Sequence, residues 1–320
     1  RDVYKRQSFL FGAKNKEFIS IKIKNKKEGW YRMKRYEVSK NGKVENVADA
    51  FSEIYSVELL MKEKPVILEN ELLRNIQKYF KNVKVTSNRD NNISFAFMDH
   101  ILEYKNVNAP VGIVISVIEE KPEINKLRKS LGQSFDYVNK EEFEKCNVRV
   151  LVTDIMAIGL NYAERIELFQ KTLYSIVELI PCEGIHFNIT EQVISREEYL
   201  KNNPLDDDYD VLIGILNVRL FNIENNENEY VMDTLGLSAV GLCDLQCHFK
   251  NLDPGEISNI LYSYGYYIFE NSDVLEEIDT IEGITENSKW KCRHEVALVE
   301  PERVVLDINP GEDFSCGYRN

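Results

Sequence analysis

The order of strand and helix signals constrains the fold of this 320-residue chain more than any other feature. Two long amphipathic helices are predicted, one after the N-cap Asn161, with Glu164 completing a capping box, and one after the N-cap Asp253. Apolar residues recur in both at i, i+3, i+4 and i+7. Runs of strand signals stand between the helices, so a strict alternation of strand and helix is absent. We therefore predict an α+β fold in which helices pack on largely antiparallel, mixed sheets.

The length of the chain indicates more than one hydrophobic core, because single cores stop growing near about 250–300 residues. We expect two α/β sandwich-like domains, with the junction where the apolar pattern fades between Leu131 and Glu144. The predicted organisation is a basic, strand-rich segment over 1–54, a first α+β domain over 55–144 and a second over 145–320. Arg1–Gln7 fits no pattern, and we interpret it as a fragment edge or artefact.

Charge is distributed unevenly along the sequence. The net charge is −13, yet residues 1–43 hold 14 basic and four acidic side chains. An acidic body repels nucleic acid, so no nucleic-acid partner is expected. Within the basic segment, the isoleucines of Phe18–Lys24 alternate with polar residues, which predicts a half-buried strand with a lysine-coated outer face. Lysines on such a face protect an edge strand from pairing with another chain.

The apolar stretches and the cysteines indicate a cytoplasmic protein. The longest apolar stretch, near Val111–Ile118, is far shorter than the roughly 20 residues of a membrane helix, so no membrane association is expected. Ser8–Ala13 is too short for the apolar part of a signal peptide. The six cysteines are scattered rather than spaced as in a secreted disulfide scaffold, which favours reduced thiols.

Motifs that cradle phosphates or activate a serine are missing from the sequence. It contains neither G-x-x-x-x-G-K-[ST] nor G-x-G-x-x-G after a strand, which removes the main support for ATP or dinucleotide binding. Gly236–Gly241 reads G-x-S-x-x-G, one residue longer than a nucleophile elbow, and no helix pattern follows it. We therefore expect no cofactor, and we interpret this segment as a turn.

A metal site is tested by geometry. The candidate zinc ligands are Cys243, Cys247, Cys292 and His294. Four residues along a strand span about 13 Å, whereas sulfurs on one zinc ion lie about 4 Å apart, given Zn–S bonds of roughly 2.3 Å. The acidic loop Asp206–Asp210 lacks the glycine and the terminal glutamate of a calcium-binding loop. We therefore expect no metal.

The predicted strand Leu242–Phe249 carries the candidate binding residues. Alternate residues of a strand point to opposite faces, so Cys247 and the adjacent His248 do not form a catalytic pair. Cys243, Leu245, Cys247 and Phe249 form the apolar face, and Asp244, Gln246 and His248 form a polar row on the other. One interpretation is an exposed row that recognises a partner through hydrogen bonds. The other is that the row pairs with side chains of neighbouring strands and fixes their register. Both stay open.

Several segments of the second half carry a resemblance to a known family. Residues 234–246 read Thr-Leu-Gly-Leu-Ser-Ala-Val-Gly-Leu-Cys-Asp-Leu-Gln, an Asp-Pro-x-Glu helix start follows, and Trp290–Glu302 and Asp307–Gly311 complete the set. They resemble an uncharacterised bacterial family, one of the "domain of unknown function" groups, with a C-terminal T-L-G-L-x-x-x-G-L-x-[DE] signature. The resemblance covers residues 230–311 and is looser over 55–200. It implies a bacterial origin and a shared fold, but no activity, cofactor or catalytic residue.

Two classes of function are compatible with these observations. The first is a non-enzymatic protein-binding module, such as an inhibitor, an immunity-type protein or an adaptor. It is favoured because no motif specifies a chemistry and because tyrosine, present 17 times, is enriched at interfaces. The alternative is a hydrolase or transferase that uses Asp244 and His248, and a small-ligand sensor is a third possibility. A deep pocket with titratable groups would favour an enzyme, and a broad, shallow face a binding module. We predict no catalytic residue.

Overall fold

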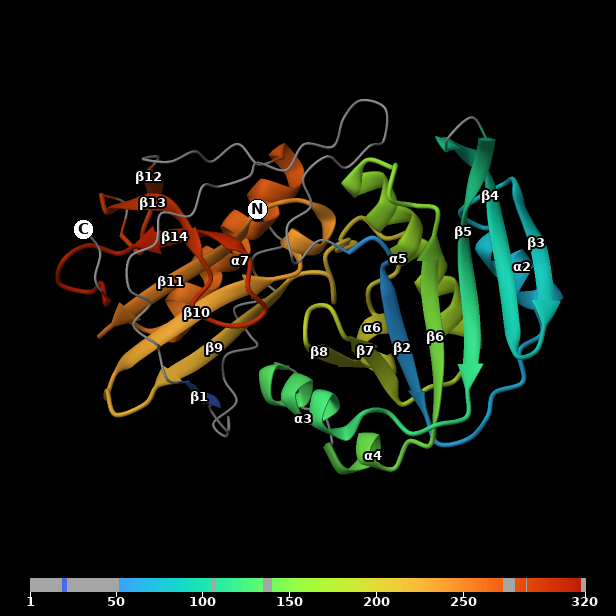
Figure 1. Cartoon of the computed structure of the whole chain (residues 1–320), viewed down its shortest axis with the longest axis horizontal. Helices are drawn as coiled ribbons and strands as arrows, with labels where there is room; N and C mark the ends of the chain where they lie inside the picture. Colours follow the sequence, from blue (N-terminus) through green and yellow to red (C-terminus); the bar gives the residue numbers. More distant parts are fainter. Residues whose placement is uncertain are drawn as a thin grey trace. The chain divides into compact units, whose positions relative to one another are not determined.

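The computed structural model describes residues 19–21, 52–104, 107–134, 140–272, 280–285 and 287–317. These residues form two compact units, each built on a seven-stranded sheet (Figure 1). The central unit comprises residues 52–215, and the C-terminal unit comprises residues 19–21 and 216–317. Helices pack on both sheets, which confirms the predicted α+β class. In the part of the chain that the structure describes, no helix is long and apolar enough to cross a bilayer.

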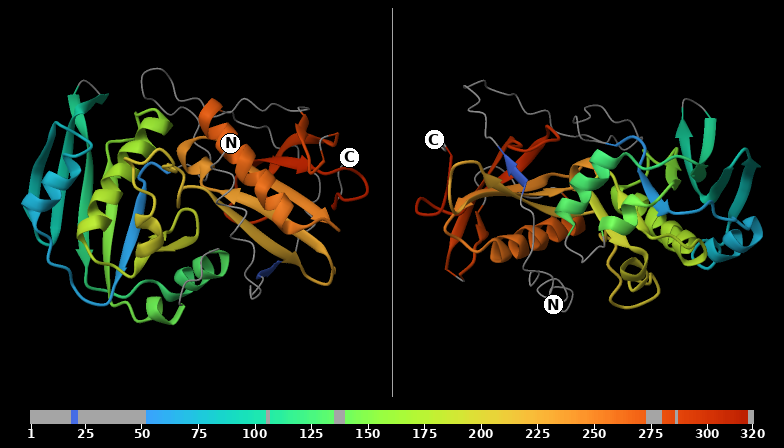
Figure 2. Two further views of the ribbon diagram at one scale, coloured as in Figure 1. Left: turned by 180° about the vertical axis from the view of Figure 1, so that it is seen from behind. Right: turned by 90° about the horizontal axis from the view of Figure 1, so that it is seen from below.

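The central unit has an antiparallel sheet in the order β3-β4-β5-β6-β2-β7-β8. Its strands are β2 (Ser56–Met61), β3 (Val83–Arg89), β4 (Asn92–Tyr104), β5 (Val107–Ile118), β6 (Val148–Ile155), β7 (Gly184–Phe187) and β8 (Gln192–Ser195). Its helices are α2 (Glu69–Ile76), α3 (Ile124–Gln133), α4 (Lys140–Glu144), α5 (Tyr162–Leu179) and α6 (Arg196–Leu200). α2 and α5 cover one face of the sheet, and α3 lies on the other (Figure 2).

Helix α5 begins and ends where the sequence predicts. The side chain of Asn161 accepts a hydrogen bond from the backbone N–H of Ala163 at 2.9 Å, as an N-cap does. The expected reciprocal bond from Glu164 is replaced, because its carboxylate lies 2.8 Å from Nδ1 of His100 on β4. Pro181, which lacks an N–H, follows the last residues of the helix.

On the other face of the central sheet, α3 and α4 cover only the strands at one end. An apolar cluster joins the two helices to β2 and β8, and its members are Leu60, Leu127, Leu131, Phe143, Cys146 and Val193. Beyond this cluster, the same face of β5 and β6 is only half-buried at Ser116, Leu151 and Thr153. The central sheet therefore has one closed face and one partly open face.

The C-terminal unit has a mixed sheet in the order β1-β9-β10-β11-β14-β13-β12. Its strands are β1 (Ile19–Ile21), β9 (Asn217–Ile223), β10 (Glu229–Leu235), β11 (Asp244–Lys250), β12 (Thr280–Glu282), β13 (Lys289–Val296) and β14 (Val304–Asn309). A 3-10 helix, η2 (Leu237–Val240), follows β10, and α7 (Pro254–Asn271) packs on β9, β10 and β11. The β1–β9 and β11–β14 pairs are parallel, and the others are antiparallel.

Part of the predicted basic segment over 1–54 can be compared with the structure. Ile19–Ile21, within the predicted strand Phe18–Lys24, forms β1 at the edge of the C-terminal sheet. The lysines of that strand, and Arg1–Gln7, lie outside the described residues. The strand and its edge position agree with the prediction, whereas the lysine-coated face stays a prediction.

The division into units differs from the junction predicted near Glu144. β5 and β6 pair directly, with Gly112 opposite Ile155 and Ile118 opposite Arg149, so that junction falls inside the central sheet. The units divide at residues 215 and 216 instead. The apolar pattern fades before Glu144 because the short helix α4 lies largely at the surface there.

The predicted strand Asp210–Phe221 also starts later than expected, since β9 begins at Asn217. Gly214 has a φ of +72°, a conformation that favours glycine. A Cβ at this position would collide with the ring of Phe187. The apolar residues over 211–215 are therefore in a packed turn of the central unit rather than in a strand.

Candidate functional site

The polar row predicted on β11 exists, but it is buried. Asp244, Gln246 and His248 are 0%, 0% and 4% exposed. The connection between β13 and β14 contacts this face, because the backbone N–H of Leu298 donates to Gln246 Oε1 at 2.7 Å. The expectation of an exposed row therefore fails, since a distant segment of the chain covers it.

Asp244 is held by a dense set of hydrogen bonds. Its carboxylate accepts from Thr234 Oγ1 at 3.0 Å, from Ser238 Oγ at 2.6 Å and from the backbone N–H of Leu237 at 3.1 Å. Thr234 Oγ1 in turn accepts from the backbone N–H of Leu245 at 2.8 Å. Residues 234–244 thus form a turn in which amides and hydroxyls near its start bind the aspartate at its end.

Two arginines, Arg219 and Arg303, form ion pairs with Asp244 and with Asp233 of β10. Arg219 binds Asp233 through Nε at 2.9 Å and Nη2 at 2.5 Å. Arg303 bridges the two carboxylates, with Nη2 2.7 Å from Asp233 and Nε 3.1 Å from Asp244. All four side chains are 0% exposed. We call these four residues the buried ion network, and its full burial indicates a structural role.

Gln246 and His248 also pair with neighbouring strands. Gln246 Nε2 donates to Asp307 Oδ1 on β14 at 3.2 Å, and His248 Nε2 lies 2.7 Å from Glu229 Oε1 on β10. These contacts match the alternative in which the row fixes strand register. Because Asp244 is fully buried, its carboxylate is not exposed to a ligand, either for recognition or for catalysis.

A hollow of about 420 Å³ in the central unit is a more accessible candidate site. It lies between α3 and the partly open sheet face, and we call it the α3 hollow. Its lining residues are Ser56, Glu58, Glu123, Lys126, Arg149, Leu151, His186, Asn188 and Ile189. Strand register creates it, because β2 places Glu58 directly opposite His186 of β7 and Leu151 of β6.

Charged and titratable groups converge in the α3 hollow. Arg149 Nη1 donates to Glu58 Oε1 at 2.6 Å, and His186 Nδ1 lies 3.4 Å from Glu58 Oε2. The other ring nitrogen of His186, Nε2, lies 2.8 Å from Ser130 Oγ on α3. The side chains of Glu58 and Arg149 are 11% and 18% exposed. These groups are therefore positioned by the fold and still partly accessible.

The charge of Glu58 depends on these neighbours. Burial alone would raise its pKa, but the contacts with His186 and Arg149 outweigh burial and hold the pKa below the ordinary 4.5. Nδ1 of His186 makes no hydrogen bond, so we attribute most of the lowering to the short contact with Arg149. Glu58 is thus ionised at neutral pH.

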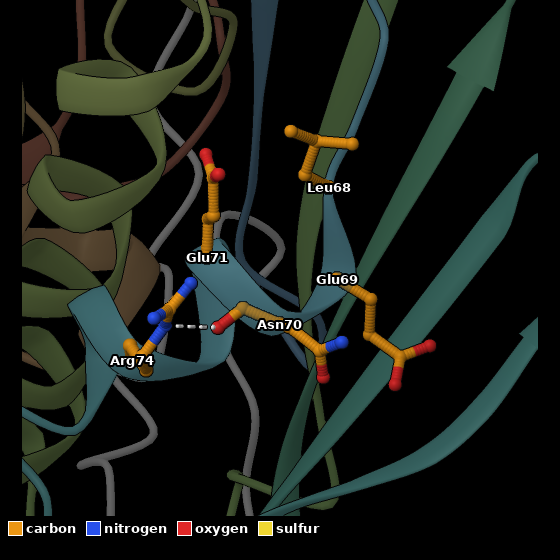
Figure 3. A pocket seen from close by; sticks show the side chains of 5 residues that line it. All are labelled: Leu68, Glu69, Asn70, Glu71 and Arg74. Atoms are coloured by element: carbon orange, nitrogen blue, oxygen red, sulfur yellow. Dashed lines mark hydrogen bonds between the residues drawn. The ribbon is translucent and has the colours of Figure 1, made fainter.

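A second hollow, of about 390 Å³, lies at the start of α2 and differs in construction. Its lining residues are Leu68, Glu69, Asn70, Glu71 and Arg74, which follow one another on a single segment (Figure 3). Arg74 Nε donates to the backbone oxygen of Asn70 on its own helix at 3.1 Å. Because the lining of this second hollow comes from one segment, whereas several strands and a helix line the α3 hollow, the α3 hollow is the better candidate site.

The sequence interpretation did not single out the residues of the α3 hollow, although a signal was present. Glu58 stands between Val57 and Leu59 in the predicted strand Tyr55–Met61, and His186 stands in the predicted strand Gly184–Asn188. A charged or titratable residue inside an apolar strand needs a partner, because burying it unpaired is costly. Their mutual contact, however, depends on the pairing of β2 with β7.

A family model, "Domain of unknown function (DUF4261)", matches residues 233–309. The match runs from Asp233 on β10 to the last residue of β14, so it includes Asp244 and Arg303 of the buried ion network. A comparison with curated proteins and one with solved structures gave no match. The resemblance to an uncharacterised family is therefore confirmed for this segment, and the α3 hollow lies outside it.

Proposed function

We propose that this protein is a non-enzymatic binding protein of the inhibitor, immunity-type or adaptor kind. Its partner is another protein that places polar side chains in the α3 hollow. The observation that carries the proposal is the convergence of Glu58, Arg149 and His186 from three strands on an accessible hollow. Together they offer a carboxylate, a guanidinium and an imidazole for hydrogen bonds to a ligand. Arginine is also enriched at protein interfaces.

The surroundings of the α3 hollow favour a protein over a small substrate. The hollow continues onto the half-buried residues of β5 and β6, among them Ser116 and Thr153. Such a broad face suits a partner of large area, whereas small-molecule sites enclose most of their ligand. The net charge of −13 disfavours nucleic acid. All six cysteines are free, which supports the expected cytoplasmic location.

The test is affinity capture from the native host by the full chain, with quantitative mass spectrometry of the retained proteins. We expect Arg149→Ala to retain at least tenfold less of the specific partner. Truncating an arginine at the centre of an interface typically costs about 2 kcal/mol of binding free energy. Arg74→Ala, at the second hollow, is the matched control and should retain it fully. Equal retention by parent and both variants contradicts the proposal.

A hydrolase is the second candidate, because Ser130, His186 and Glu58 follow the order hydroxyl, imidazole, carboxylate of a catalytic triad. Ser130 is only 2% exposed and does not line the hollow, which is why we rank binding first. A fluorophosphonate probe distinguishes the two functions. Labelling of the parent that is lost in Ser130→Ala supports the hydrolase, and an unlabelled parent rejects it.

A further inference from the structure

We propose that Glu229, His248 and Cys316 of the C-terminal unit bind a zinc ion. A carboxylate oxygen, an imidazole nitrogen and the Cys316 sulfur lie within 4.8 Å of one another. Among the residues that the structure describes, no other group of three or more histidine, cysteine or acidic side chains is close enough to share an ion. This site is separate from the α3 hollow and does not depend on its function.

Strand pairing brings the three residues to one face of the sheet. β10 and β11 are antiparallel with Val231 opposite His248, and Glu229 lies two residues from Val231 on the same face. At the other edge of β11, a bridge pairs Phe249 with Ser315, and the backbone N–H of Cys316 donates to the oxygen of His248 at 3.2 Å. Three adjacent segments therefore present one ligand each, side by side.

This backbone pairing also positions the ligands before an ion arrives. His248 is 4% exposed and Cys316 8%, whereas the Glu229 side chain is 20% exposed. The imidazole is oriented by Glu229 Oε1, 2.7 Å from Nε2, and its Nδ1 side faces Gly317. Gly317 has a φ of +81°, and a Cβ there would lie 3.1 Å from Nδ1. The pocket for the ring is thus closely shaped, with Glu229 on the side toward solvent.

The donor set determines the kind of ion. Thiolate, imidazole and carboxylate together suit zinc, whereas magnesium and calcium prefer sites made of oxygen alone. Three protein ligands leave a fourth tetrahedral position for water or a ligand group. Binding replaces the His248–Glu229 hydrogen bond with bonds to the ion, so the three side chains close around it.

None of these three residues belongs to the set of candidate zinc ligands that the sequence offers, which is Cys243, Cys247, Cys292 and His294. Cys247 lies on the apolar face of β11, Cys243 directly precedes that strand, and both are buried. His248 lies on the opposite face, and its partner Cys316 comes from the C-terminal segment. The expectation of no metal rested on the spacing of Cys243 and Cys247, and that argument does not apply to this set.

The test uses the full chain, stripped with a chelator and titrated with Zn²⁺ against a competing chromophoric chelator. We expect one equivalent to bind. Cys316→Ser and Glu229→Gln should each weaken binding at least tenfold, since even partners outside the ligand set change affinity by about 10–100-fold. Cys182→Ser, in the central unit, is the matched control and should bind as the parent does. Co²⁺ in place of zinc should give a thiolate charge-transfer band that only Cys316→Ser removes.

Circular dichroism of each variant shows whether it is folded. Glu229 is the most exposed of the three ligands, so Glu229→Gln carries the test if Cys316→Ser unfolds. Stoichiometric binding by the parent, weakened in the folded variants, supports the site. A parent that fails to compete with the chelator, or affinities unchanged in both variants, overturns it.

Discussion

The buried ion network of the C-terminal unit and the α3 hollow of the central unit contain the same kind of contact in different surroundings. Arg219 and Asp233 approach to 2.5 Å with both side chains fully buried. Arg149 and Glu58 approach to 2.6 Å, but their side chains are 18% and 11% exposed. The same arginine–carboxylate contact thus has different consequences in the two places. A pair without solvent access stabilises the fold, whereas the groups of a partly exposed pair can also form hydrogen bonds with a ligand.

The largest effect is expected when the buried ion network is broken. Asp244→Ala leaves Nε of Arg303 and the amide of Leu237 without their acceptor, and it leaves Asp233 as the one carboxylate of the network facing two buried arginines. Removing one partner of a buried charge pair costs about 3–5 kcal/mol. Urea unfolding followed by tryptophan fluorescence measures this loss. A variant within about 1 kcal/mol of the parent would mean that the network is not structural.

The next variant tests whether burial, and not the unit in which an ion pair lies, determines its contribution to stability. Arg165 and Asp154 of the central unit also form a buried pair, 2.6 Å apart with side chains 3% and 2% exposed. Asp154 also accepts from the backbone N–H of Tyr55 at 2.6 Å. Asp154→Ala should therefore cost about 3–5 kcal/mol of unfolding free energy, as in the other unit. A loss below about 1 kcal/mol would show that burial does not explain the difference.

A smaller effect is expected at the α3 hollow. The pKa of Glu58 is lowered in the folded state, so its carboxylate contributes stability above pH 4.5. That contribution is lost as the pH falls through the folded pKa. Glu58→Gln should cost roughly 1 kcal/mol at neutral pH and flatten the acid dependence of the unfolding free energy.

Glu119→Gln is the matched control for this variant. Glu119 contacts Lys64 at 2.6 Å, but the two side chains are 56% and 45% exposed. In urea unfolding at pH 7 and at pH 4, Glu119→Gln should therefore change the unfolding free energy, and its dependence on pH, less than Glu58→Gln does. An acid dependence that is the same in Glu58→Gln and in the parent would contradict the charge contacts of the hollow.

The sequence predicts local structure more accurately than it predicts which side chains are buried. The caps Asn161 and Asp253 and the alternating faces of β11 depend on neighbouring residues, and the structure confirms them. The cover over Asp244 depends on the segment that contains Leu298 and Arg303, which is distant in sequence. Periodicity shows which face a residue takes, but not what lies above that face.

The same limit applies to the boundary between units and to the candidate site. The local loss of apolar pattern near Glu144 predicts a domain junction there, whereas the pairing of β5 with β6 keeps both sides of that point in one sheet. Glu58 and His186 could each be flagged as polar residues in apolar strands. Their convergence with Arg149 required the strand order β6-β2-β7, which no local pattern specifies.

The most direct test of the account compares the two regions in one measurement. Hydrogen exchange of the full chain is followed by mass spectrometry, with and without the captured partner. We predict slower exchange in segments that line the α3 hollow, namely residues 123–130, 148–152 and 185–189, and no change over 233–250. Slower exchange over 233–250, with none around the α3 hollow, would contradict the account.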